Sequence, residues 1–234
     1  MTVPRRAFAT ALSLAGLGAL ALVARHDLIG HAIAQDRMAR DGMAQDGMAQ
    51  NALAALAAKP GSLPDMALGP AKAPVTIIEY ASMSCPHCAA FDENVFPMLR
   101  SKYIDTGKVR FVFREFPLDV RAAAASMLAR CIGKDDAEKF FGAIDTLFKQ
   151  QEQLMAQPKE TLIRIGRLAG MDDQAIESCE SDQAQLDKIS ADQKFAGDEL
   201  KVDATPTFFI NGERIKGSMS FEDIDRKIGS LLKK

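Results

Sequence analysis

The stretch VTIIEYASMSCPHCAAF, residues 75–91, constrains the fold of this chain more than any other segment. Its first eight residues form a short, β-branched run that is apolar on both faces, which predicts a buried strand. A helical pattern follows through CAAFDENVFPMLRSKY, and Pro97 predicts an interruption of that helix. The sequence therefore predicts a strand that leads directly into a helix, with Cys85 and Cys88 where the helix begins.

A thiol at this position has unusual chemistry. The first turn of a helix presents unpaired backbone N–H groups and the positive end of the helix dipole, and both stabilise a thiolate. His87 can add a hydrogen bond or a positive charge beside Cys85. In C-x-x-C sites the pKa of a cysteine falls from about 8.5 to between about 3.5 and 7.5. Because a stabilised reduced form makes the disulfide a stronger oxidant, the pair is predicted to be redox-active and oxidising.

Two other uses of a cysteine pair fit the sequence less well. Structural zinc needs four ligands, and Cys131 and Cys179 are isolated residues of separate predicted helices. If the first 34 residues are removed, His87 is the one histidine left, and it lies inside the motif. No separate histidine then remains as the base of a cysteine protease. We expect no metal and no cofactor.

The N-terminus resembles an export signal. Arg5 and Arg6 precede an apolar run at residues 11–23, which is too short to span a bilayer comfortably. The arginine pair resembles a twin-arginine signal, and AIAQD predicts cleavage after Ala34. The alternative is an uncleaved membrane anchor. In both cases residues 1–34 place the domain outside the cytoplasm.

Residues 35–64 are predicted to form a flexible extension. A degenerate five-residue repeat, MARDG-MAQDG-MAQNA, walks around a helix instead of staying on one face, and its glycines weaken a helix. Four prolines between residues 60 and 74 mark the entry into the folded domain. The alternative is an oligomerisation arm whose alanines and methionines pack against other copies.

The remaining chain reads as an α/β domain with a helical insertion. VRFVFREFPL predicts a second strand that Pro117 ends, and residues from about 119 to 201 are helical in pattern throughout. TPTFFI, an Asn-Gly pair and ERIKGS predict a hairpin, and SFEDIDRKIGSLLKK predicts a final helix. The net charge of −2 includes no basic field, so no nucleic-acid partner is expected.

Three separated features resemble the DsbA-like thiol:disulfide oxidoreductases, which have a thioredoxin fold. SMSCPHCAAF is similar to their active site, Glu79 lies six residues before Cys85, and ATPTFFINGE is similar to their cis-proline loop. The resemblance covers roughly residues 65 to 232. It implies a fold class of α/β, a thioredoxin fold with an inserted helical subdomain, within a domain at residues 65–234.

The resemblance also implies a role for each site residue. Cys85 is expected to be the exposed, attacking thiol, Cys88 its resolving partner and His87 the residue that tunes Cys85. Glu79 is expected to be a buried acid that assists proton transfer, with a surface carboxylate as the alternative. Thr205 and Pro206 are expected to dock an extended substrate backbone.

The implied setting is the periplasm. The implied partners are exported proteins with free or mispaired cysteines, and a membrane redox partner that reoxidises or reduces the protein.

Cys131 and Cys179 depart from the simplest members of that family. An even number of cysteines in an exported protein favours disulfide chemistry, so a structural disulfide between two helices is expected. Two buried free thiols or a second redox-active pair remain alternatives.

Three functions stay open at this point. The first is a dithiol oxidase, which the CPHC motif favours. The second is an isomerase or reductase, which Thr205 before the proline and an oligomerising arm would favour. The third is a non-catalytic thioredoxin-like chaperone or a copper-binding module.

Overall fold

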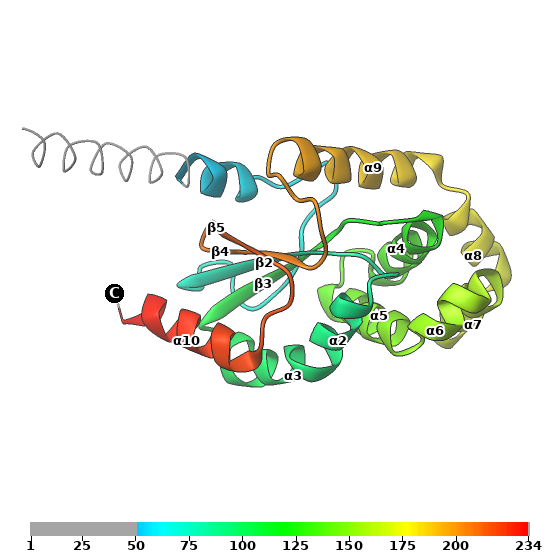
Figure 1. Cartoon of the computed structure of the whole chain (residues 1–234). Helices are drawn as coiled ribbons and strands as arrows, with labels where there is room; N and C mark the ends of the chain where they lie inside the picture. Colours follow the sequence, from blue (N-terminus) through cyan, green and yellow to red (C-terminus); the bar gives the residue numbers. More distant parts are fainter. Residues whose placement is uncertain (1–50, 234) are drawn as a thin grey trace, which may run out of the picture. The chain divides into compact units, whose positions relative to one another are not determined.

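A computed structural model of the chain describes residues 51–233. Their centre is a five-stranded sheet in the order β1-β3-β2-β4-β5 (Figure 1). Its strands are β1 (Met66–Leu68), β2 (Val75–Ala81), β3 (Val109–Glu115), β4 (Thr207–Ile210) and β5 (Glu213–Lys216). Strands β2 and β3 are parallel, and the other pairs are antiparallel. The mixed α/β architecture and its thioredoxin-like sheet confirm the predicted fold class.

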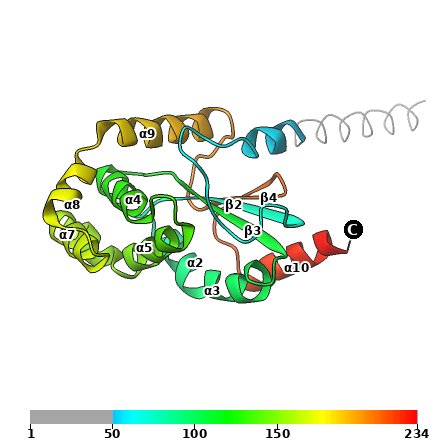
Figure 2. The ribbon, with the colours of Figure 1, turned by 180° about the vertical axis from the view of Figure 1, so that it is seen from behind.

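The helical block predicted at 119–201 is present as six helices, and most of them lie beside the sheet (Figure 2). They are α4 (Val120–Gly133), α5 (Ala137–Lys149), α6 (Gln151–Ala156), α7 (Pro158–Leu168), α8 (Asp173–Glu180) and α9 (Gln183–Asp198). Aspartates cap the first turns of several: Asp119, for example, accepts hydrogen bonds from the N–H groups of Arg121 and Ala122.

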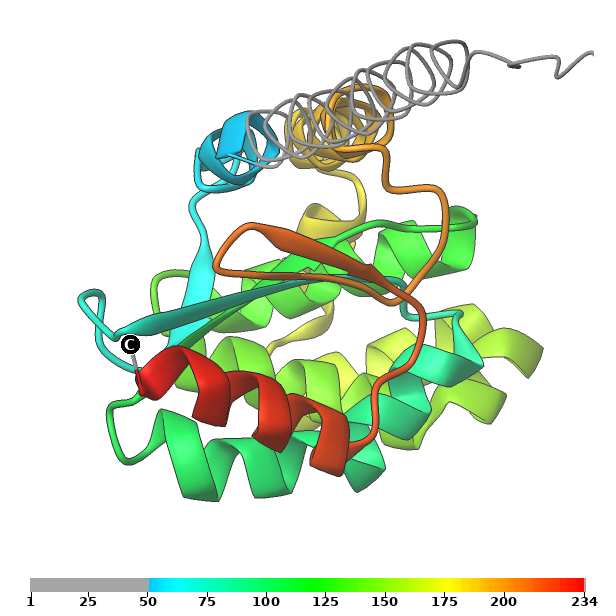
Figure 3. The same ribbon diagram turned by 60° about the vertical axis from the view of Figure 1, so that its left-hand side comes forward.

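Both faces of the sheet are covered, because alternate strand residues point to opposite sides. Ile78 and Tyr80 pack with a helical segment at residues 51–57 and with α9. Val75 and Ile77 face the helices on the other side, among them α2 (Pro86–Asn94), α3 (Phe96–Leu99) and α10 (Phe221–Leu232) (Figure 3). Helix α9 therefore covers one face of the sheet, and the name insertion is kept below for α4 to α8.

The helix after the cysteines breaks near Pro97, as predicted. Helix α2 ends at Asn94, α3 begins at Phe96, and a π-helical turn, η1 (Arg100–Ile104), follows. Proline has no N–H to donate to the carbonyl one turn earlier, so an uninterrupted α-helix cannot run through this position.

The predicted hairpin is present and joins β4 to β5. Asn211 and Gly212 have φ angles of 45° and 85°, the positive values that a tight two-residue hairpin turn requires. Strand β1 was not predicted. Its three residues lie in the proline- and glycine-rich entry segment, and they form a strand because they pair with Phe111–Phe113 of β3.

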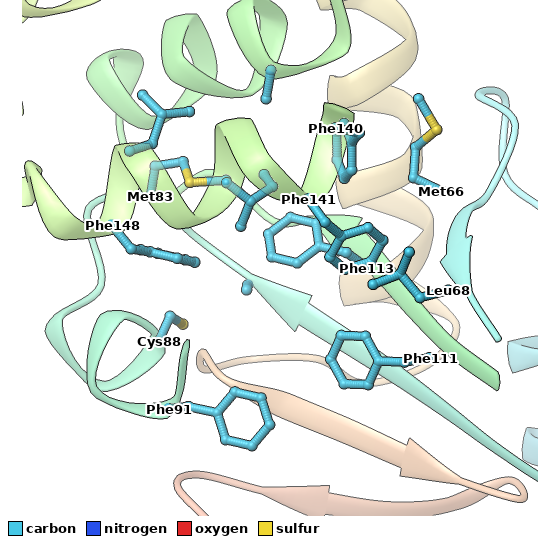
Figure 4. Packing of buried hydrophobic residues seen from close by; sticks show 14 of the residues in the cluster. Met66, Leu68, Met83, Cys88, Phe91, Phe111, Phe113, Phe140, Phe141 and Phe148 are labelled. Carbon is cyan, nitrogen blue, oxygen red and sulfur yellow. The ribbon is translucent and has the colours of Figure 1, made fainter. Parts of the chain in front are cut away.

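The insertion shares one apolar core with the sheet (Figure 4). Phe141 of α5 lies 6.0 Å from Phe111 and 6.4 Å from Phe113 of β3, measured between ring centroids. The Phe140 ring lies 5.8 Å from Phe113. Aromatic pairs at these distances stabilise the contact beyond the area that they bury. At this contact the inserted helices and the sheet therefore share one hydrophobic core.

The flexible extension predicted at 35–64 is wrong for its last part. Residues 51–57 are helical, and Ala57 is only 1% exposed. The Arg114 guanidinium donates hydrogen bonds to the carbonyl oxygens of Ala57 and Lys59, both at 2.9 Å, and to the Asp65 carboxylate. A repeat pattern cannot show this packing, because the anchor is a strand residue some 50 positions away.

The export signal predicted at 1–34, and residues 35–50 of the extension, lie outside the described residues. Within 51–233, no helix has the length and apolar character needed to cross a membrane.

Truncation of the shared aromatic core tests its importance. We expect Phe141→Ala to lower the free energy of unfolding by about 3–5 kcal/mol, the usual cost of removing a buried aromatic ring. Chemical denaturation monitored by circular dichroism measures this change. Leu168→Ala is the control, since Leu168 is 73% exposed and its loss should change stability by less than about 0.5 kcal/mol. Equal effects of the two substitutions would contradict the shared core.

Candidate active site

Cys85 is the last residue of the segment that connects β2 to α2. It is the N-cap residue of the helix, with extended backbone angles of φ −86° and ψ 116°, and Pro86 occupies the first helical position. Proline suits that position because its missing N–H needs no partner there. The backbone N–H groups of His87 and Cys88 then face the sulfur of Cys85.

Three separate parts of the chain hold the turn at Ser82–Cys85. The Ser82 hydroxyl accepts a hydrogen bond from the N–H of Leu118 at 3.1 Å, in the loop after β3. The Gln151 side chain of α6 donates to the carbonyl oxygens of Met83 and Cys85. The Cys85 thiol itself donates to the carbonyl oxygen of Thr205 at 3.2 Å.

The expectation of an exposed Cys85 is wrong in this structure. Both thiols are free, but Cys85 is only 4% exposed and Cys88 is fully buried. The loop that carries Thr205 contacts Cys85, and α6 reaches its carbonyl. Pro86 and His87 are exposed, so the motif meets solvent at the two residues between the cysteines. The side chain of His87 is exposed, and its backbone N–H is the group that faces Cys85.

The surroundings of Cys85 stabilise its thiolate. The Cys88 thiol, the Thr205 hydroxyl and the two backbone N–H groups of α2 lower the pKa of Cys85 to about 5, although burial acts in the opposite direction. The Thr205 hydroxyl oxygen is buried and has no hydrogen-bond partner of ordinary geometry among residues 51–233, so it is available to donate to this sulfur. Cys85 is therefore ionised at neutral pH.

Cys88 has the opposite character. Burial raises the pKa of its thiol far above the ordinary value, and the neighbouring Cys85 and the Glu79 carboxyl raise it further. The pair thus consists of a thiolate beside a thiol that holds its proton firmly.

A buried carboxyl group, Glu79, acts on Cys88, and a second carboxyl group, Asp92, acts on Glu79. Burial, followed by the charges of Asp92 and Cys85, raises the pKa of Glu79 well above its ordinary range. Glu79 lies on β2 and is 3% exposed, so it is no surface carboxylate, and one of its oxygens has no hydrogen-bond partner in the described part of the chain. Burial and the nearby Asp145 raise the pKa of Asp92 to about 7. Both carboxyl groups therefore hold their protons to higher pH than an exposed carboxyl group does.

The sequence interpretation missed Asp92 and Gln151. Asp92 lies four residues after Cys88 on α2, and this spacing puts both on one helix face, a signal that was available. Gln151 gave no local signal, because its partners lie more than 60 residues earlier in the chain.

The predicted Thr205–Pro206 segment lies at the site, next to Cys85. The peptide bond between the two residues is cis, and β4 begins directly after it. The carbonyl oxygen of Pro206 accepts a hydrogen bond from the N–H of Gly217. The carbonyl oxygen of Thr205 is the one that faces the cysteine.

The second cysteine pair lies elsewhere. A disulfide joins Cys131 of α4 to Cys179 of α8, with 6.2 Å between their Cα atoms. It links two helices of the insertion across 48 residues of sequence.

Comparison with known proteins agrees with this geometry. The sequence profile of the thioredoxin family matches residues 62–229, well over half of the chain. The crystal structure of alpha-DsbA1 from Wolbachia pipientis superposes with a TM-score of 0.68 at 35% identity, covering 71% of this chain and 90% of that one. The chain therefore belongs to the thioredoxin family, and within it to the DsbA-like proteins.

Curated relatives point the same way. A protein of Rickettsia bellii provisionally named protein-disulfide oxidoreductase is 38% identical over 150 residues, 63% of this chain and 57% of the relative. Disulfide bond formation protein D of Bacillus subtilis is 27% identical over 185 residues, 76% of this chain and 82% of that protein. The chain spans about three fifths of the length of the rickettsial relatives that it matches.

The ionisation of Cys85 predicts how pH acts on the reduced protein. A depressed pKa stabilises the folded, reduced form fully above the ordinary thiol pKa, about 8.5, and this stabilisation is lost as pH falls through about 5. We therefore expect the melting temperature of the reduced protein, relative to the oxidised protein, to fall as pH is lowered from about 9 to below 5. Calorimetry of both forms measures this difference. A difference that stays constant with pH, or that grows at low pH, would contradict the assignment.

Proposed function

We propose that the protein is a thiol:disulfide oxidoreductase that acts as a dithiol oxidase, passing the Cys85–Cys88 disulfide to exported proteins. The observation that supports this most directly is the contrast between the two thiols. Stabilisation of the Cys85 thiolate favours the reduced form at neutral pH. Since the reduced form is the product of substrate oxidation, the disulfide is a strong oxidant.

The proposed reaction has two exchanges. A substrate thiolate attacks Cys85 Sγ in the disulfide, the Sγ–Sγ bond breaks, and Cys88 leaves and takes up a proton. A second substrate thiolate then attacks the substrate sulfur of the mixed disulfide and releases Cys85 as a thiolate. The substrate loses two electrons and gains a disulfide, and the pair gains both electrons as one thiol and one thiolate.

Cys88 needs a proton source, because it is buried and its own thiol form is strongly favoured. Glu79 faces it and keeps its own proton more readily than an exposed carboxyl, since burial raises its pKa. In the proposed reaction Glu79 gives a proton to Cys88 as it leaves, and takes one when Cys88 attacks in the reverse direction.

The Thr205–Pro206 segment suits an extended substrate. When Cys85 is protonated, its thiol donates a hydrogen bond to Thr205 O. As a thiolate, or bonded to another sulfur, Cys85 has no proton to donate, so Thr205 O is then free to accept an N–H group from the substrate backbone. Such a contact is independent of substrate sequence and suits many different partners.

The proposed setting is the periplasm, with the export signal of residues 1–34 delivering the chain there. A membrane redox partner that reoxidises the dithiol completes the cycle. Without such a partner each molecule would oxidise one dithiol and stop.

The reduction potential of the Cys85–Cys88 pair tests the direction of the reaction. We expect a value close to −120 mV, the strongly oxidising end of the known range. The measurement is equilibration with glutathione buffers and quantification of the two forms by mass spectrometry. Cys131→Ser/Cys179→Ser protein is measured alongside, so that the second pair cannot contribute.

A value near about −200 mV or lower would refute the oxidase. It would favour an isomerase, the alternative that Thr205 before the proline supports, and refolding of a scrambled disulfide substrate would test that alternative directly. A Cys85→Ser/Cys88→Ser protein that keeps full activity in either assay would contradict both enzyme functions.

Glu79→Gln tests the proposed proton transfer. Glutamine keeps the size of the side chain but cannot take up the Cys88 proton, so we expect Cys88 to resolve a Cys85–glutathione mixed disulfide about 10²-fold more slowly at pH 7. Stopped-flow release of glutathione measures this rate. Glu93→Gln is the control, since Glu93 is an exposed carboxylate on α2, the helix that carries Cys88. A Glu79→Gln rate within twofold of wild type would assign the residue a structural role.

A further inference from the structure

Within residues 51–233, one side chain of the helical insertion, Gln151, donates hydrogen bonds to the carbonyl oxygens of the turn at Ser82–Cys85, the catalytic turn. Gln151 is the first residue of α6 and is half-buried. Its amide nitrogen lies 2.8 Å from the carbonyl oxygen of Met83 and 3.0 Å from that of Cys85. We propose that Gln151 is a positioning residue through which the insertion holds the turn at Met83–Cys85, and thereby sets the redox reactivity of the Cys85–Cys88 pair.

The Gln151 amide has as many N–H donors as the turn offers carbonyl acceptors at this contact. A glutamine amide carries two N–H donors on one nitrogen, and here each has its own carbonyl acceptor. Within residues 51–233, no other side chain donates to a carbonyl of the Ser82–Cys85 turn. An alanine in place of Gln151 would leave both carbonyl groups without this donor.

The carbonyl of Cys85 is also the first acceptor of helix α2. It receives the N–H groups of Cys88 at 3.1 Å and Ala89 at 3.2 Å. A group that fixes this oxygen therefore fixes the first helical turn, whose N–H groups stabilise the Cys85 thiolate. The hydrogen bonds of the Gln151 side chain within residues 51–233 go to backbone carbonyl oxygens, so its effect on the reaction passes through the geometry of that turn.

Helix α6 is itself firmly held, which makes Gln151 an effective anchor. Leu154 of α6 is fully buried in the core that contains Met83 and Phe148 (Figure 4). The Arg121 guanidinium of α4 donates to the carbonyl oxygen of Met155 at 3.2 Å. Residue 83 is thus attached to the insertion twice, through its side chain in the core and through its carbonyl on Gln151.

The inference rests on the proposed thiol–disulfide exchange, and a matched pair of variants tests it. Gln151→Ala removes both hydrogen bonds. Gln153→Ala removes the same side chain from an exposed position on the same helix. For each variant the equilibrium constant with glutathione is measured, and the Cys85 thiolate is titrated by its absorbance at 240 nm.

For Gln151→Ala we expect the tendency of the disulfide to oxidise glutathione to fall about tenfold, as the loss of two hydrogen bonds of ordinary strength would produce. The thiolate titration should move to higher pH. Gln153→Ala should match wild type in both measurements.

A second variant covers the case in which Gln151→Ala does not fold. Gln151→Glu keeps the size of the side chain but places a carboxylate against two carbonyl oxygens. It should shift both measurements in the same direction as alanine, and further, because its charge also opposes the thiolate.

The failures are distinguishable. If Gln151→Ala lowers the melting temperatures of the oxidised and reduced forms equally and leaves the equilibrium and the titration unchanged, Gln151 is only structural and the inference is overturned. If wild-type protein does not exchange disulfides with glutathione, the proposed function is overturned, and the inference with it.

Discussion

The interaction on which the site depends is the contact between the Cys85 sulfur and the amino-terminal turn of helix α2. It exists because a buried strand, β2, ends at Ala81, one short turn before the helix begins, and because Pro86 starts the helix without needing a hydrogen-bond partner. The N–H groups of the first turn of α2 have no partner within the helix, and they stabilise the nearby Cys85 thiolate. The parallel pairing of β2 with β3, and the antiparallel pairing of β2 with β4, bring the loop that contains Thr205 to the same place. The strand pairing therefore brings three chain segments together at one sulfur atom.

The second constraint is the difference between two neighbouring thiols. They are three residues apart, yet their pKa values shift in opposite directions. The Cys88 thiol, the Thr205 hydroxyl and the helix turn lower the pKa of Cys85, whereas burial in the apolar core raises that of Cys88. A pair of thiols with equal pKa values would have no preferred leaving group. In the proposed reaction this asymmetry decides which sulfur meets the substrate and which one needs help from a buried carboxyl. Glu79 supplies a buried titratable group on that inner side, where solvent does not reach Cys88.

Local features of this chain could be predicted from its sequence, and distant contacts could not. Strand β2, the break before Pro97 and the Asn211–Gly212 hairpin each depend on a few adjacent residues, and each was found. The burial of Cys85 was missed, because it depends on segments 66 and 120 residues away that close over it. The packing of residues 51–57 was missed for the same reason, since the anchor for that segment is Arg114. Periodicity reports which face of an element is apolar, but it does not report what will cover that face.

The continuity of the core explains why the insertion matters to the chemistry. Phe141 of α5 packs against β3, and Met83 of the catalytic turn lies in the same apolar cluster, so the inserted helices and the site cannot shift independently. The insertion also contributes to the burial of Cys85, which leaves the exposed Pro86 and His87 as the solvent-facing edge of the motif. In the proposed reaction a substrate cysteine must therefore approach past these two residues, along the loop that carries Thr205. A folded surface fits such an approach poorly, whereas an extended, unfolded segment can follow the loop and present its sulfur, which is the state in which a newly exported chain arrives.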